Sequence, residues 1–160
     1  MHLDAMDLKI LSSLQDNARL SNVELSERVN LSASQCYRRL KTLEDKGVIR
    51  GYTALLDPSA LGFGVMAHVS VSLEKHGDNP VHAFKDAIHE YPEVLECHAV
   101  SGDADYVLRV VAPDLKAFSD FLMHRLLILP FIATVRSSIF LDELKNTTAL
   151  PLQNIKSDKP

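Results

Sequence analysis

A run of polar and basic residues between Ser32 and Asp45 has the side chains that DNA recognition requires. If Cys36, Leu40 and Leu43 form the inward stripe of a helix, the opposite side is polar and basic. Its residues are Ser34, Gln35, Arg38, Arg39, Lys41 and Thr42. Gln and Arg can bond two atoms of a base edge, whereas Ser, Thr and Lys reach phosphates. The pattern predicts a DNA-reading helix; the alternative is a three-helix interaction module with a solvated basic face.

The segment Gly102-Asp103-Ala104-Asp105 could bind a small zwitterion. Backbone amides exposed at a glycine turn can bind a carboxylate, and a nearby Asp can bind an ammonium group. A free α-amino acid carries both charges. The alternative at this point is ordinary turn chemistry.

Metal and catalytic chemistry are not indicated. His82 and His89 could share one helix face, but the histidines lack ligand spacing, and neither Cys36 nor Cys97 has a partner at CxxC distance. The histidines considered are His68, His76, His82, His89, His98 and His124. There is no G-x-S-x-G elbow and no Walker-type phosphate loop. We expect no metal site, no cofactor and no enzyme.

Composition limits the class of protein. The chain has 160 residues, of which 46% are hydrophobic and 24% charged, and this excludes disorder for most of its length. Its longest apolar run, Leu126 to Ala133, contains Pro130 and is too short to span a bilayer. No secretory signal is visible, and two cysteines make no disulfide framework. We expect an intracellular, cytoplasmic protein without membrane contact.

The net charge of −4 argues against a nucleic-acid partner until it is divided along the chain. Residues 1–52 carry eight Lys/Arg and seven Asp/Glu, whereas residues 53–160 carry nine and fourteen. The first part is therefore mildly basic and the second acidic. This asymmetry indicates two segments with different tasks.

Three helices are predicted in the first part. The first covers Leu3 to Leu14. The second and third open at Ser21 and Ser32, each with a capping box completed by Glu24 or Gln35. Only two residues separate the second helix from the cap of the third, and this close connection is typical of a helix-turn-helix.

The second part alternates strand and helix in the order β-α-β-β-α-β, which is the ferredoxin-like arrangement. Strands are expected at 66–73, 94–101, 106–111 and 131–141, and helices at 80–91 and after Pro113. The predicted fold class is α+β, with an N-terminal winged-type helix-turn-helix and a C-terminal ferredoxin-like sandwich. The expected segments are residues 1–51, a linker strand or hinge at 52–64, a domain at 65–145 and a tail at 146–160. The sheet face without helices is expected to mediate association.

Several motifs together resemble the Lrp/AsnC (feast/famine) transcriptional regulators from residue 3 to about 145. They are Leu3-Asp4-x-x-Asp7, Leu31-Ser32-x-Ser34, Arg38-Arg39-Leu40-Lys41-x-Leu43-Glu44, Gly47-Val48-Ile49-x-Gly51-Tyr52, Leu56-Asp57-Pro58-x-x-Leu61-Gly62 and Gly102-Asp103-x-Asp105-Tyr106. The segment Thr147 to Leu152 looks like the leucine-responsive branch.

The resemblance implies a regulator that binds promoter or operator DNA and responds to a free amino acid. The implied DNA contacts are Ser32, Ser34, Gln35, Arg38, Arg39 and Lys41. Family members form dimers that assemble into octamers, and the amino acid binds between dimers. The implied effector residues are His98, Gly102, Asp103, Ala104, Asp105, Ser137 and Ser138.

The effector is expected to be leucine or methionine. Because Ala104 stands where an aromatic residue is common in the family, the ligand's identity does not transfer with the motif. Two alternatives remain: an amino-acid-binding allosteric module of metabolism without a direct DNA role, and a ferredoxin-like enzyme.

Overall fold

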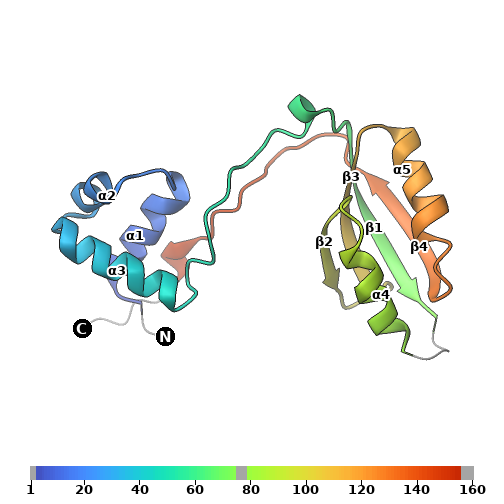
Figure 1. Ribbon diagram of the computed structural model, residues 1–160, viewed down its shortest axis with the longest axis horizontal. Coiled ribbons are helices and arrows are strands. Elements are labelled where there is room, and N and C mark those ends of the chain that lie inside the picture. Colours follow the sequence, from blue (N-terminus) through green and yellow to red (C-terminus); the bar gives the residue numbers. More distant parts are fainter. Residues whose placement is uncertain (1–2, 75–78, 156–160) are drawn as a thin grey trace. The chain divides into compact units, whose positions relative to one another are not determined.

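The computed structural model describes residues 3–74 and 79–155. The chain divides into two units, one formed by Met1–Leu55 with Lys145–Pro160 and the other by Leu56–Leu144 (Figure 1). Within the described residues, no helix has the length and apolar character needed to cross a bilayer.

The first unit has three helices, each opened by a side-chain cap. They are α1 (Ala5–Asp16), α2 (Asn22–Val29) and α3 (Ala33–Asp45). Asp4, Ser21 and Ser32 are the N-caps, and each forms a reciprocal capping box with the residue three positions later. All three helices contribute to one core, made of Ile10, Leu11, Leu25, Val29, Cys36 and Leu43. The predicted helices and both predicted capping boxes are confirmed.

The segment after α3 has no strand. Residues 51–57 have no regular secondary structure, and a single 3₁₀ turn, η1 (Ser59–Leu61), follows them. A strand needs a hydrogen-bonded neighbour, and within the described chain no strand pairs with this segment. Of the strand and the extended linker that the sequence allowed, the structure has the linker.

Leu150 and Leu152, near the end of the described chain, contact the helical unit. The side chain of Gln15 donates to the carbonyl of Leu150 at 3.1 Å and accepts from its backbone N–H at 2.6 Å. Leu152, in the 3₁₀ turn η3 (Leu152–Asn154), packs against the core of the helical unit. Residues 150–154 of the expected tail therefore lie against the helical unit, because the Gln15 amide bonds the Leu150 backbone and Leu152 packs against the core.

The second unit is a four-stranded antiparallel sheet with two helices. Its strands are β1 (Val65–Leu73), β2 (Val94–Ala99), β3 (Tyr106–Ala112) and β4 (Ile132–Ile139), in the order β2-β3-β1-β4. The helices are α4 (Pro80–His89) and α5 (Leu115–Phe121), the latter continued by a π-helical turn, η2 (Leu122–Leu126). The predicted ferredoxin-like fold class is confirmed.

One face of this sheet forms the core with both helices. Alternate residues of β1 and β3 pack against Phe84 of α4 and Phe118 of α5. The strand residues on that side are Ala67, Val69, Val71, Leu108, Val110 and Ala112. Because successive side chains of a strand point to opposite faces, the intervening residues lie on the other face, which we call the open face.

Candidate functional site

The N-terminal end of α3 uses part of its predicted DNA-reading set for its own cap. The hydroxyl of Ser32 accepts from the backbone N–H of Gln35 at 3.3 Å, and the Gln35 side-chain oxygen accepts from the Ser32 N–H at 3.4 Å. Ser34 is exposed, with its hydroxyl 3.3 Å from that of Ser32. These side chains present hydroxyl and amide groups at the surface where the helix begins.

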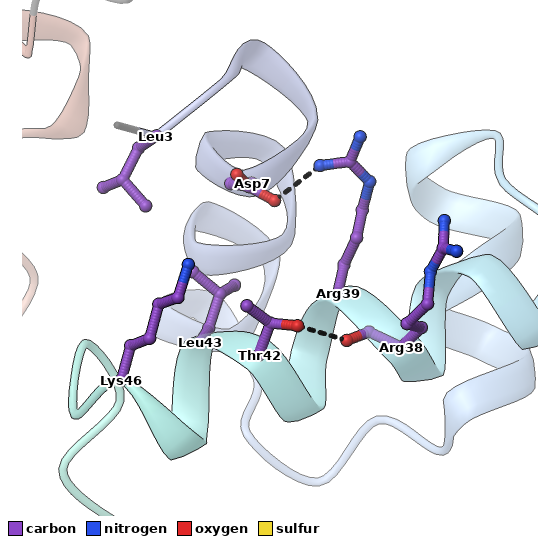
Figure 2. Close-up of a pocket in the computed structure, with 7 residues that line it drawn as sticks. All are labelled: Leu3, Asp7, Arg38, Arg39, Thr42, Leu43 and Lys46. Atoms are coloured by element: carbon purple, nitrogen blue, oxygen red, sulfur yellow. Dashed lines mark hydrogen bonds and ion pairs between the residues drawn. The ribbon is translucent and has the colours of Figure 1, made fainter. Parts of the chain in front are cut away.

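The neighbouring arginines of α3 have different surroundings. The guanidinium of Arg39 donates to Asp4 at 2.8 Å and to Asp7 at 2.7 Å, which ties α3 to the first turn of α1 (Figure 2). Hydrogen bonds to Asp7 and Asp4 raise the pKa of Arg39 above its usual value. Arg38 is exposed and has no ion pair within the described chain.

Lys41 is the remaining basic residue of the predicted set on α3. Its Nζ lies 3.0 Å from Oδ1 of Asp45, one turn later. This hydrogen bond raises the pKa of Lys41. Both side chains are mostly exposed, so the pair can open at little cost when a stronger anion approaches.

A cleft of about 370 Å³ lies between α1 and α3. Figure 2 shows Arg38, Arg39 and Lys46 on α3, with Arg39 directed at Asp7 of α1. The lining residues are Leu3, Asp7, Arg38, Arg39, Thr42, Leu43 and Lys46. Lys46 was absent from the predicted set, although its spacing of eight residues from Arg38 places it on the same side of the helix.

A second cavity, of about 500 Å³, lies on the open face beside the turn between β2 and β3. The register of β1 and β4 brings its polar residues together, because Ser70 pairs with Arg136 and Ser72 with Thr134. The lining residues are Ser70, Ser72, Val100, Ser101, Asp103, Ala104, Val107, Thr134 and Arg136. This cavity contains a carboxylate, a guanidinium, several hydroxyls and a small apolar wall.

Two of the seven predicted effector residues, Asp103 and Ala104, line that cavity. Gly102 forms the turn with φ +136°, a conformation that other residues rarely adopt. The carboxylate of Asp105 accepts from the backbone N–H of Leu73 at 2.8 Å and so closes the end of β1.

Five of the seven predicted effector residues are not in the cavity lining: Gly102 and Asp105, which belong to the turn, and His98, Ser137 and Ser138. His98 lies 3.5 Å from Glu96. Ser138 pairs with His68 on the open face, whereas Ser137 pairs with Val69 on the helix-covered face. Arg136 was absent from the predicted set, because no spacing pattern in the sequence marks it. Only the strand register, which pairs it with Ser70, places it at this cavity.

Metal binding finds no support in the described part of the chain, which has no group of three His, Cys, Asp or Glu side chains that could hold an ion. His76 lies outside the described residues. Both cysteines are unpaired, with Cys36 buried in the helical core and Cys97 exposed on β2.

The chain matches two protein families. Residues 3–50 match the winged helix-turn-helix DNA-binding family, and residues 66–150 match the Lrp/AsnC ligand-binding domain. Between them, the two matches contain both clefts described above.

Sequence relatives match over nearly the whole chain. The leucine-responsive regulatory protein of Rhizobium meliloti (strain 1021) is 43% identical over 91% of this chain and 94% of that protein. The leucine-responsive regulatory protein of Escherichia coli (strain K12) is 39% identical over 94% of this chain and 92% of that protein.

Solved structures agree with this relation. A transcriptional regulator from Neisseria meningitidis in complex with L-Met has a TM-score of 0.92 and 46% identity, covering 94% of this chain and 97% of that one. An AsnC family regulator from Agrobacterium tumefaciens has a TM-score of 0.88 and 38% identity, covering 94% and 98%.

Proposed function

The chain belongs to the Lrp/AsnC family of transcriptional regulators, and from this premise we propose which residues read DNA and which amino acid it senses. It is a DNA-binding, amino-acid-responsive regulator, not an enzyme. The proposals below concern the DNA contacts, the effector, the assembly and the compartment.

For DNA, we propose that α3 enters the major groove. Arg38 stands opposite the buried stripe of Cys36 and Leu43, so it faces the groove and can bond a guanine edge with two donors. Ser32, Ser34 and Gln35 supply further DNA contacts at the start of α3. Lys41 supplies another once its ion pair with Asp45 opens. Arg39 supports this surface through α1.

For the effector, we propose a free amino acid in the open-face cavity, with methionine first and leucine second. The observation that carries this proposal is that Arg136 and Asp103 line the same cavity. A guanidinium matches a carboxylate with paired hydrogen bonds, and an Asp carboxylate matches an α-ammonium group. Val100, Ala104 and Val107 supply an apolar wall for the side chain. The methionine bound by the N. meningitidis regulator supports this order.

For assembly, we propose a homodimer that places two α3 helices about one duplex turn apart, and further association into an octamer through the open face of the sheet. The effector then binds where dimers meet. It changes DNA binding because it has different affinities for the assembled and separated states. DNA as the partner supports a cytoplasmic location.

Calorimetry and thermal unfolding of the full chain test the effector proposal. Methionine at about 100 times its dissociation constant should stabilise the native state by about 2.7 kcal/mol. Leucine at the same concentration should stabilise it by less. Arg136→Gln and Asp103→Asn should each abolish that shift. Lys116→Gln, which removes a cation from α5, should leave it unchanged. A methionine shift that survives Arg136→Gln would move the effector site elsewhere.

A further inference from the structure

Four cations lie on α3 and at its C-terminal cap, and they divide into two pairs. Arg39 and Lys41 have carboxylate partners within the chain, at distances of 2.7 to 3.0 Å. Arg38 and Lys46 have none among residues 3–74 and 79–155. Arg38 and Lys46 are therefore the two of these cations that an outside anion can reach without opening a pair.

The two unpaired cations lie on one ridge of the helix. Residues 38, 42 and 46 are four positions apart, so their side chains follow one another along the same side. About 12 Å of helix separates Arg38 from Lys46 at 1.5 Å per residue, and both side chains are long enough to close part of that distance. Between them, the hydroxyl of Thr42 donates to the Arg38 carbonyl at 2.9 Å (Figure 2).

The charged side chains that line the cleft beside this ridge favour the binding of an anion. Leu3, before α1, and Leu43 of α3 are the two apolar residues that line this cleft. Its one carboxylate, Asp7, is already bonded to Arg39 at 2.7 Å. The groove-facing side of α3 thus continues, toward α1, into a cleft with two free cations at its edges.

We propose that this cleft seats a backbone phosphate of bound duplex DNA, held by Lys46, at the margin of the groove in which Arg38 meets a base edge. The inference rests on the proposed DNA-binding role of α3. Phosphates line both margins of a major groove, so side chains on the flanks of a helix in the groove contact them. A contact of this kind fixes the position of the helix and carries no sequence information.

Salt dependence of DNA binding tests the proposal. The probe is a duplex of about 30 base pairs selected from a random library by the wild-type chain, with a shuffled duplex beside it. Fluorescence anisotropy measures affinity from about 50 to about 300 mM KCl. Lys46→Gln should reduce the slope of log affinity against log salt by about 1, and weaken binding roughly fivefold near physiological salt. Both duplexes should lose the same factor.

Matched variants separate the outcomes. Lys46→Arg should keep the wild-type slope, and Lys9→Gln, an equal charge change on α1 outside the cleft, should also keep it. An unchanged slope for Lys46→Gln, with thermal unfolding as in the wild type, would overturn the phosphate seat. A loss confined to the selected duplex would overturn it too, because it would mean base reading. If the wild-type chain itself bound no duplex, the DNA role of α3 would fail first.

Discussion

The guanidinium of Arg39 on α3 lies 2.7 Å from the carboxylate of Asp7 on α1. The same nitrogen also donates to Asp4, which caps α1. The capping box of the first helix and the middle of the DNA-reading helix therefore form one hydrogen-bonded network. Arg39 consequently links α3 to α1, while its neighbour Arg38 has no ion pair within the described chain.

Arg39→Gln should lower the free energy of unfolding by about 1–2 kcal/mol, since charge-assisted hydrogen bonds are lost at a partly exposed site. Denaturant unfolding followed by circular dichroism measures this change. Arg38→Gln is the matched control and should stay within about 0.5 kcal/mol of the wild type. Equal stability of the Arg39 and Arg38 variants would contradict the positioning role.

Acid should weaken the helical unit through Asp4. The hydrogen bond from the backbone N–H of Asp7, and after it the guanidinium of Arg39, hold the pKa of Asp4 below its usual value of 3.8. A carboxyl with a lowered folded pKa stabilises the fold above its unfolded pKa, and that contribution is lost as pH falls through the folded value. As the pH is lowered from about 5 to about 2, the melting temperature should therefore fall less steeply for Asp4→Asn than for the wild type. Parallel curves would show that Asp4 contributes nothing.

Ala104→Phe should narrow the effector cavity and weaken methionine binding, because it adds an aromatic ring of the kind common at this position in the family. Ala104 is half-buried in the cavity wall, and a benzyl group there would occupy the space next to Asp103. Overpacking of this kind costs about 1–3 kcal/mol, which is roughly a 5- to 150-fold loss of methionine affinity by calorimetry. Ala60→Phe, on the exposed turn η1, is the control and should bind methionine as the wild type does. Unimpaired binding by Ala104→Phe would place the ligand away from this wall.

The contact between Gln15 and Leu150 should stabilise the DNA-binding unit. Gln15→Ala removes both hydrogen bonds of the side-chain amide to the Leu150 backbone and should cost about 1 kcal/mol or more. For a unit of this size, a loss of 1 kcal/mol lowers the melting temperature by about 4–8 °C. Gln153→Ala, an equal truncation at an exposed position of the same segment, should have little effect. A melting temperature unchanged by Gln15→Ala would show that the segment adds no stability.

Local signals made much of the fold predictable. Ser21 and Ser32 begin helices because a hydroxyl and a carboxylate or amide three residues later satisfy free amides within one turn. Alternation along 66–73 marks a strand because its two sides face different surroundings. Both features depend only on residues that are close together in the sequence, so they can be predicted from the sequence alone.

What the sequence by itself determined is a helix-turn-helix joined to a ferredoxin-like unit, with a polar helix face and a glycine turn as candidate sites. Only the tertiary structure decided which side chains of those sites are free. Arg38 and Arg39 are adjacent and chemically identical in the sequence, yet Asp4 and Asp7 hold one of them from another helix. Arg136 reaches the cavity of Asp103 through the register of β4 on β1, which is set by hydrogen bonds between segments more than sixty residues apart. Such pairings depend on packing in space, and no local pattern contains them.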